Sequence, residues 1–328
     1  MNTRLLGKSL SVSAIGYGCM GLSHAYGFAL EKNLAIKCIR EAFDCGYTFF
    51  DTAEVYTGKF EDGSISINEE IVGEALRPIR DKVIIATKGG IIIDANHKII
   101  SRSAPEEFRK SLEQSLKRLG VETIDLYYQH RMDPAVSPET VAVTMRQFIQ
   151  EGKIRYWGIS NGSEEYIRRA HAVCPVSCVQ LRYSMLGRWN ERLFPLLEEL
   201  NIGFVAFSPL ANGFLSSGND HASFGTLDYR PQMPQYTSEG REKAKPLLNL
   251  LEDMAAKKQV SVAQLSLAWV LAQKPYIVPI PGSSKTARIK ENAEAVKIKF
   301  TSEELQEINK LLVKTDFAVF GEQEKQGF

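Results

Sequence analysis

The stretch VIIATKGGIIIDANHKIISRSAPEEFRKSLEQSLKRLGVETIDLYY, residues 83–128, contains two predicted strands with a predicted helix between them. Val83 to Thr87 and Thr123 to Tyr128 are short runs rich in β-branched, apolar and aromatic residues, which is typical of strands. Pro105 to Leu119 instead repeats its apolar residues at helical spacing. The stretch therefore predicts one strand–helix–strand unit, the building block of a parallel sheet.

The predicted helix also carries a start signal in its sequence. Ser103 is followed three residues later by Glu106, a spacing that resembles a capping box, and Pro105 suits a first helical turn. We therefore expect the Ser103 side chain to cap this helix.

The same alternation of strand and helix patterns continues in both directions along the chain. The predicted strands are Val12 to Gly18, Tyr47 to Asp51, Val83 to Thr87, Thr123 to Tyr128, Ile154 to Ile159, Ser177 to Leu181, Gly203 to Phe207 and Tyr276 to Ile280. Helical patterns include Leu34 to Asp44, Pro105 to Leu119, Pro138 to Gln150, Glu164 to His171, Glu191 to Leu200 and Arg288 to Val296. Eight such units without a break in composition favour an α/β fold with a single (β/α)₈ TIM barrel over residues 1–328, rather than a doubly wound sheet plus a second domain.

Two segments lie outside this repeat. Arg4 to Leu6 and Leu10 to Val12 flank Gly7-Lys8, which predicts an N-terminal β-hairpin that caps the barrel floor. Residues 211–240, after the seventh strand, form a long connection rich in Gly, Ser, Asn and Pro. Connections of about 30 residues are usually functional lids, and we expect one here.

Composition excludes several classes of function. The chain of 328 residues and 36.7 kDa has 40 Lys and Arg against 39 Asp and Glu, with no segment of one sign, so we expect no nucleic-acid partner. Without an N-terminal apolar stretch or a run of about 20 apolar residues, we expect no membrane association and a cytoplasmic location. The five cysteines are odd in number and form no C-x-x-C pair, so we expect reduced thiols and no metal site.

A glycine motif near the N-terminus suggests a different fold. Residues 16–21, GYGCMG, match the dinucleotide-binding pattern G-x-G-x-x-G, and the acidic Asp51 ends the next strand. In that fold the third glycine opens a helix, yet the helical pattern here starts only near Glu31. We therefore interpret the motif as a glycine-rich turn at the barrel mouth, and a Rossmann dehydrogenase as the weakest alternative.

Polar side chains follow many of the predicted strands. In a (β/α)₈ barrel the carboxyl ends of all strands face one mouth, so residues there converge. These residues are Asp51, Lys88, His130, Ser160-Asn161, Gln180, Phe207-Ser208 and Pro281-Gly282-Ser283, with Tyr56 five residues past Asp51. Because burying several charged groups together is unfavourable without a compensating role, the set predicts a functional site.

Four of these side chains, those of Asp51, Tyr56, Lys88 and His130, suit one reaction. A phenol titrates near ~10 and is a poor proton donor at neutral pH, but an adjacent ammonium on Lys88 would lower the pKa of Tyr56. Asp51 would keep Lys88 charged, and His130 could orient a carbonyl oxygen by hydrogen bonding. Such a set delivers a proton to an oxygen while negative charge develops there, which is half of a carbonyl reduction.

Over nearly the whole chain, the sequence resembles the aldo-keto reductase family, in particular its long-chain, bacterial-type members. The matching segments, in family order and at family-like spacing, are DTAEVY at 51–56, TKG at 87–89, LYYQHR at 126–131 and GKIRYWGISN at 152–161. The resemblance implies a catalytic tetrad of Asp51, Tyr56, Lys88 and His130, with Tyr56 as the proton donor. It implies reversible, NADPH-dependent reduction of small aldehydes or ketones to alcohols, in which hydride passes from the nicotinamide to the carbonyl carbon.

The same resemblance implies NADPH/NADP⁺ as cofactor. Ser160, Asn161 and Gln180 would bind the nicotinamide carboxamide, Phe207 would stack on its ring, and Ser208, Leu210 and Gly213 would follow the pyrophosphate. Arg288 and Lys285 would bind the 2′-phosphate, with Gly282 and Ser283 offering backbone donors to an anion. Glu291 and Asn292 would contact the adenine. The remaining expected cofactor contacts are Gly18, Cys19, Met20 and Asp51.

Two positions depart from the family pattern. Many relatives carry an acidic residue where this chain has Arg182, and a basic residue or glycine where it has Asn212. These departures leave the phosphate contacts and the loop path open. On the substrate side, four aromatic or imidazole side chains are candidates for an apolar mouth above Tyr56: His24, Tyr26, Trp157 and Trp189.

Two other classes of function fit parts of the same pattern. A lysine at a strand end is also where Schiff-base lyases and aldolases place their amine, although Asp51 would hold Lys88 charged and non-nucleophilic. A regulatory protein that retains the cofactor and turns it over slowly is the second class. The residues leave the natural substrate, the reaction direction and the oligomeric state open.

Overall fold

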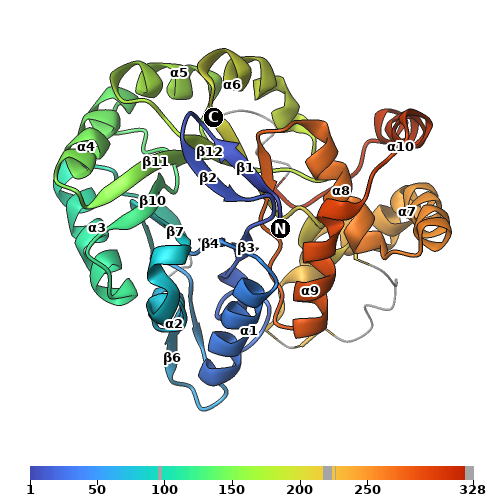
Figure 1. Cartoon of the computed structure of the whole chain (residues 1–328), viewed down its shortest axis with the longest axis horizontal. Helices are drawn as coiled ribbons and strands as arrows, with labels where there is room; N and C mark the ends of the chain where they lie inside the picture. The colour runs from blue at the N-terminus through green and yellow to red at the C-terminus, as the bar shows by residue number, and fades with distance from the viewer. Residues whose placement is uncertain (95–97, 217–223, 226, 322–328) are drawn as a thin grey trace.

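A computed structural model describes residues 1–94, 98–216, 224–225 and 227–321. Eight parallel strands form one sheet that curls around the centre of the molecule, in the order β14-β13-β12-β11-β10-β7-β4-β3 (Figure 1). Their bounds are β3 (Tyr17–Gly18), β4 (Phe49–Asp51), β7 (Ile84–Gly89), β10 (Ile124–Gln129), β11 (Ile154–Ser160), β12 (Cys178–Arg182), β13 (Gly203–Phe207) and β14 (Ile277–Pro279). The predicted (β/α)₈ barrel is confirmed.

Backbone hydrogen bonds connect the first strand of the sheet to the last. The Gly16 amide donates to the Pro279 carbonyl at 2.9 Å, and the Gly18 amide donates to the Pro281 carbonyl at 3.2 Å. Gly18 has to be a glycine here, because a Cβ would lie 2.7 Å from the Ile280 carbonyl oxygen. The glycine-rich turn therefore closes the barrel, and only a three-residue 3₁₀ turn, Met20–Leu22, follows it.

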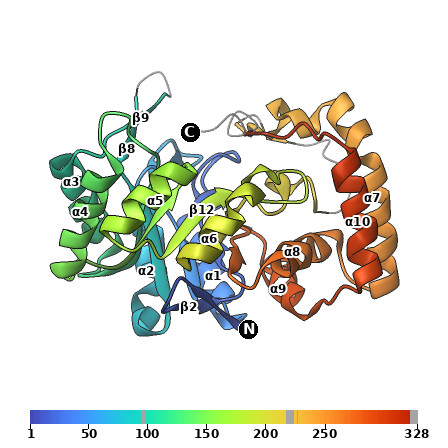
Figure 2. The ribbon, with the colours of Figure 1, turned by 90° about the horizontal axis from the view of Figure 1, so that it is seen from above.

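Helices surround the sheet on its outer side (Figure 1). Their bounds are α1 (Lys32–Asp44), α2 (Asn68–Leu76), α3 (Pro105–Leu119), α4 (Pro138–Gln150), α5 (Glu164–Val173), α6 (Phe194–Leu200), α7 (Ser238–Lys258), α8 (Val262–Gln273), α9 (Thr286–Glu294) and α10 (Ser302–Lys314). α7 and α10 pack side by side at the periphery, outside the ring (Figure 2). The connection after β13 contains residues 217–223 and 226, which lie outside the described residues, and α7 begins near its predicted end.

Alternation along the strands separates two hydrophobic cores. Residues such as Phe50 and Tyr127 join the larger core between sheet and helices, whereas their strand neighbours Phe49, Leu126 and Tyr128 belong to a smaller core inside the barrel. At the carboxyl ends of the strands, the side chains that point into the barrel form the next layer above that inner core. The period of two thus decides which strand-end residues face the mouth.

The predicted N-terminal hairpin is confirmed as β1 (Thr3–Leu6) paired antiparallel with β2 (Leu10–Ser13). The Arg4 guanidinium donates to three backbone carbonyls between the end of α8 and the start of β14, including that of Ile277 at 2.6 Å. A Cβ on Gly203, the first residue of β13, would lie 2.6 Å from the Leu6 Cα. Figure 2 shows this hairpin at one end of the barrel and the hairpin of β8 (Ile91–Ile93) and β9 (Ile99–Ser101) at the other.

Three local predictions need correction. The predicted strand Val12 to Gly18 is divided, because Val12 and Ser13 pair within the hairpin and only Tyr17–Gly18 enters the barrel. Ser103 does not cap α3, whose N-cap is Ala104; the Ser103 hydroxyl accepts a hydrogen bond from Gln129 instead, at 3.0 Å. The pattern from Glu191 to Leu200 is a 3₁₀ turn, Trp189–Leu193, followed by α6.

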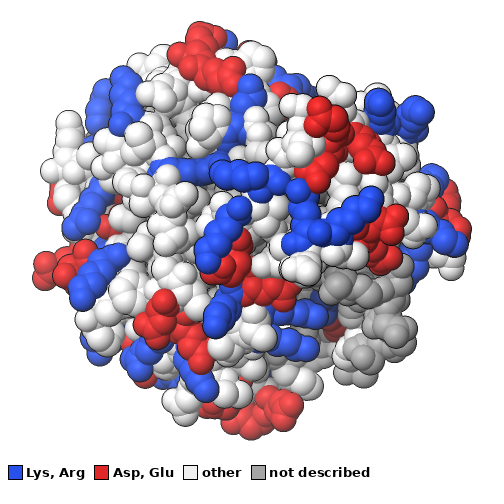
Figure 3. Space-filling model, turned by 45° about the vertical axis from the view of Figure 1, so that its right-hand side comes forward, with Lys and Arg blue, Asp and Glu red and all other residues white. Residues whose placement is uncertain are grey.

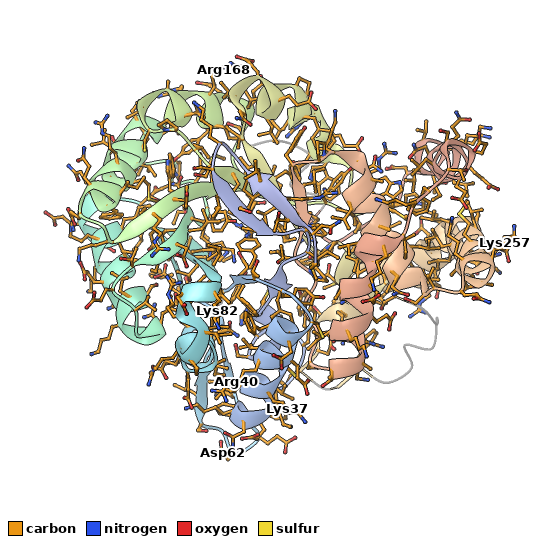
Figure 4. All side chains as sticks on the ribbon, in the orientation of Figure 1. Lys37, Arg40, Asp62, Lys82, Arg168 and Lys257 are labelled. Carbon is orange, nitrogen blue, oxygen red and sulfur yellow. The ribbon has the colours of Figure 1, made fainter. Side chains whose placement is uncertain are left out.

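Charged side chains of both signs are interspersed over the face shown in Figure 3. Lys37 of α1, Arg168 of α5 and Lys257 of α7 point away from the barrel (Figure 4). The five cysteines are free thiols. Within the described ranges, no helix has the length and apolar character needed to cross a bilayer. In the same ranges no group of three His, Cys, Asp or Glu side chains is arranged to hold a metal ion.

Candidate functional site

Lys88 lies at the centre of the candidate site. Its side chain points into the barrel near the end of β7, and only 1% of the residue is exposed. Its Nζ donates to Asp51 Oδ1 at 2.5 Å, to the Thr52 carbonyl at 2.7 Å and to Tyr56 Oη at 3.3 Å. Burial lowers the pKa of Lys88, but Asp51 and Tyr56 outweigh this and raise it above its ordinary value. The amine therefore stays an ammonium at neutral pH.

Tyr56 lies in the loop after β4, with its ring among three basic side chains. Lys88 Nζ lies 4.8 Å from the ring centroid, His130 meets the ring edge-on at 6.0 Å, and His24 stacks nearly parallel at 5.9 Å. Burial raises the pKa of Tyr56, and the opposing effect of Lys88 does not cancel it. The expected lowering of this pKa is therefore wrong, because desolvation of the phenolate exceeds the attraction of the ammonium.

His130 follows β10 directly and is buried. Its backbone amide donates to the Gly89 carbonyl at 3.0 Å, which fixes the residue beside the end of β7. Burial, followed by the charges of Arg131 and Lys88, lowers the pKa of His130 well below 6.5. Its Nδ1 is buried without a hydrogen-bond partner among the described residues. A neutral imidazole with an unused ring nitrogen suits a hydrogen bond to a ligand.

The lowered pKa of His130 makes stability depend on pH. The unfolded chain takes up a proton at this imidazole below its ordinary pKa near ~6.5, whereas the folded chain does not, so stability is lost as pH falls. We expect unfolding free energy to fall by on the order of 1 kcal/mol more in the parent than in His130→Gln between about pH 7.5 and about 5.5. Urea unfolding at both pH values measures this, and equal losses in the two proteins would contradict it.

Ser160, Asn161 and Gln180 lie together on neighbouring strands. Ser160 and Gln180 are paired across β11 and β12, and the Asn161 side chain donates to the Ser160 hydroxyl at 3.0 Å. Gln180 Nε2 donates to the second oxygen of Asp51 at 2.7 Å. Of the three predicted carboxamide-binding residues, Gln180 is thus hydrogen-bonded to Asp51, and Ser160 and Asn161 lie beside it at the end of β11.

The segment after β13 has a strained backbone. Ser208, Ala211 and Asn212 have φ angles of 51°, 48° and 60°, a region that non-glycine residues rarely occupy, and Gly213 follows at 94°. Strained backbone of this kind clusters at ligand-binding sites. Phe207 is partly exposed at the end of β13, and its Cα partner across the sheet is Arg182.

The predicted phosphate segment follows β14 and lies beside β3. The Tyr17 hydroxyl donates to the Ser283 carbonyl at 2.5 Å. Lys285 and Arg288, just before and within the first turn of α9, are exposed, and within the described residues neither forms an ion pair. Glu291 instead contacts the Ser261 hydroxyl, and Asn292 is buried.

The remaining predicted residues divide into two groups. Cys19 is buried, and its amide donates to the Asp51 carbonyl at 2.9 Å, so Gly18, Cys19 and Met20 lie against the end of β4. Trp157 does not line the mouth. It is fully buried in the core between the sheet and the helices, and its indole donates to the Pro175 carbonyl at 3.0 Å. That candidate is wrong, because its position on β11 directs the ring toward the helices.

Two residues of the site, Thr52 and Glu54, make contacts that had no sequence prediction. The Thr52 carbonyl accepts from Lys88, and Glu54 accepts from the Ile91 amide at 3.3 Å and from the Ser111 hydroxyl. No sequence signal distinguishes a carbonyl used in this way, since every residue has one. Glu54 lies within the quoted segment 51–56, so its acidic side chain was a visible signal.

Comparisons with known proteins agree on one family. A family model described as the aldo/keto reductase family matches residues 14–313. A curated relative, "Probable aldo-keto reductase 1" of Glycine max, is 40% identical over 303 residues, which cover 92% of this chain and 86% of that protein. The solved glycerol dehydrogenase of Gluconobacter oxydans aligns with a TM-score of 0.84 at 28% identity and covers 95% of both chains. An aldo-keto reductase of Klebsiella pneumoniae, solved in complex with NADPH, aligns with a TM-score of 0.72 at 25% identity and covers 97% of this chain and 99% of that one.

Proposed function

Because the chain belongs to the aldo/keto reductase family, we propose that it reduces small aldehydes or ketones to alcohols, reversibly, with NADPH as cofactor and Tyr56 as proton donor. The observation that carries this proposal is the position of Lys88 Nζ between Asp51 and Tyr56 Oη. An ammonium in that position stabilises the phenolate that remains after the proton has left. The bound cofactor would supply the hydride that reaches the carbonyl carbon.

Each residue of the tetrad has a separate task in this proposal. Tyr56 Oη donates its proton to the carbonyl oxygen as negative charge develops there, and Lys88 stabilises the resulting phenolate. Asp51 holds Lys88 charged and aimed, which disfavours a nucleophilic amine and therefore a Schiff-base lyase. His130, neutral and adjacent to the Tyr56 ring, orients the carbonyl oxygen by a hydrogen bond. In the reverse direction, the phenolate accepts the proton of the alcohol.

Features of this chain also support the proposed cofactor. Ser160, Asn161 and Gln180 present amide and hydroxyl groups on one wall, and the strained segment 208–213 offers backbone groups beside the mouth. Lys285 and Arg288 leave two cationic side chains accessible at the start of α9, where helix geometry favours an anion. The proposal keeps the cytoplasmic location and the single domain over residues 1–328 that the sequence predicts.

A direct experiment tests this function. Titration of the protein with NADPH and with NADH, followed by intrinsic fluorescence, should give saturable binding with a preference for NADPH. A panel of aldehydes and ketones should then show NADPH consumption that depends on the carbonyl compound. Absence of binding, or consumption of NADPH without any dependence on a carbonyl compound, would contradict the proposal.

Arg288 is the residue on which the preference for NADPH should depend most. A bidentate contact to a 2′-phosphate is worth about 1.5–3 kcal/mol, so Arg288→Ala should raise the dissociation constant for NADPH about 10- to 100-fold. Binding of NADH, which lacks that phosphate, should change little. The control is Arg241→Ala on α7, and an equal loss of affinity for both cofactors in Arg288→Ala would assign Arg288 a merely structural role.

A further inference from the structure

Arg182 packs on Phe207 at the mouth of the barrel. The two residues are Cα partners in the parallel pair of β12 and β13, so their side chains project in the same direction. The Arg182 guanidinium carbon lies 4.9 Å from the centroid of the Phe207 ring, within the range of a favourable cation–π contact. Arg182 is 6% exposed, so this contact is largely shielded from water.

The same guanidinium contacts the C-terminal segment, residues 317–321. The ring of Phe320 has its centroid 5.4 Å from the guanidinium carbon. Gly321 lies so close that a Cβ on it would be 2.5 Å from Arg182 Nε. The Phe320 amide donates to Gln235 Oε1 at 2.9 Å, which fixes the segment to the connection after β13. A single side chain thus joins the C-terminal segment to the ring at the end of β13.

Asn212 extends these contacts to two further loops. Arg182 Nη1 donates to Asn212 Oδ1 at 3.3 Å, and Asn212 Nδ2 donates to the hydroxyls of Tyr26 and Tyr229 at 3.1 and 3.5 Å. The two tyrosine rings stack with centroids 5.7 Å apart. Arg182 and Asn212 are the two positions that depart from the family pattern, and in the structure they contact each other.

We propose that Arg182 is a positioning residue that holds the plane of Phe207 and couples it to the C-terminal segment. The Arg182 cluster comprises Arg182, Phe207, Asn212 and Phe320. The inference rests on the proposed function, in which Phe207 stacks on the nicotinamide. Because Phe207 and Phe320 share one guanidinium, displacement of the C-terminal segment loosens the ring that supports the cofactor, and cofactor binding in turn orders the segment.

Hydrogen exchange on the cofactor-free protein tests the first half of the proposal. Arg182→Met removes the charge and the bond to Asn212 while keeping an unbranched side chain. Loss of the cation–π contacts should accelerate exchange of the Phe320 amide about 3- to 30-fold. The matched control is Arg109→Met, since Arg109 also packs on a phenylalanine, Phe148, at 5.0 Å, but on the outer surface. Unchanged exchange in Arg182→Met would overturn the coupling.

NADPH titration tests the second half. Arg182→Met and Phe320→Ala should each raise the NADPH dissociation constant about 3- to 30-fold, and the double variant should resemble Arg182→Met, because both act through one ring. With NADPH deuterated at the transferred position, the isotope effect on kcat should rise in Arg182→Met, a change that a merely structural role would not produce. Arg182→Lys should recover part of the affinity.

The outcomes separate the two proposals. If the effects of Arg182→Met and Phe320→Ala multiply in the double variant, the residues act independently and the coupling is overturned. If the parent itself does not bind NADPH, the proposed function falls together with the cofactor half of this inference, while the exchange experiment still decides whether Arg182 holds the C-terminal segment. If Arg182→Met gives insoluble protein, Phe320→Ala alone tests the coupling, because Phe320 is partly exposed and its truncation disturbs the fold less.

Discussion

Tyr56→Phe should bind NADPH with the parent's affinity and lose carbonyl reduction by about 1,000-fold, within the range that removal of a general acid produces. The substitution deletes only Oη, and Lys88 keeps its bonds to Asp51 and the Thr52 carbonyl. The ring contacts to His24 and His130 also remain. Fluorescence titration measures the affinity, and NADPH consumption with a reactive aldehyde such as nitrobenzaldehyde measures turnover.

A matched tyrosine provides the control for this experiment. Tyr276→Phe deletes a hydroxyl that donates to Glu198 at 3.0 Å on the exposed surface, away from the mouth. Its turnover should equal that of the parent. Reduction by Tyr56→Phe at the parental rate would show that the proton comes from another group, and the role assigned to Tyr56 would then be wrong.

Lys88→Met should abolish turnover and destabilise the fold by about 3–5 kcal/mol, because it leaves the Asp51 carboxylate buried without its cation. Asp51 is 2% exposed, and within the described residues its carboxylate would keep only the hydrogen bond from Gln180. In this variant burial raises the pKa of Asp51, so the destabilisation should shrink as pH falls and the carboxyl takes up a proton. Urea unfolding at several pH values measures both effects.

Two further variants distinguish the charge from the packing. Asp51→Asn combined with Lys88→Met removes both charges and should recover most of the lost stability without recovering turnover. Lys153→Met breaks an exposed pair with Glu113 and should cost at most about 1 kcal/mol. A Lys88→Met protein as stable as the parent at neutral pH would contradict the buried ion pair.

Much of the site follows from the order of residues along the strands. Asp51, Lys88 and Gln180 lie at strand ends, and parallel strands in a barrel bring those ends to one mouth, so their meeting was predictable once the alternation was recognised. Trp157, a candidate for the apolar mouth, was wrong because a strand residue faces the inside of the barrel only at every second position. Which alternate residues of a strand point into the barrel depends on the register of that strand, and a short apolar run does not reveal the register.

Electrostatic environment was less predictable than position. The sequence places an ammonium beside the phenol of Tyr56, and that proximity lowers the pKa of a phenol. Only the packed loops around the ring determine how far water is excluded, and this burial raises the pKa of Tyr56 overall. Ser103 shows the same limit, since its hydroxyl could cap a helix or bond Gln129, and the tertiary structure selects the latter.

The sequence by itself determined the eight-strand barrel, its hairpin and the identity of the four polar side chains at the mouth, because each follows from patterns within a short stretch of chain. The tertiary structure alone decided that Arg182, Asn212 and Phe320 meet. These residues come from three distant segments, and contacts at such separations depend on how the closed barrel brings its loops together. Local periodicity carries no information about them.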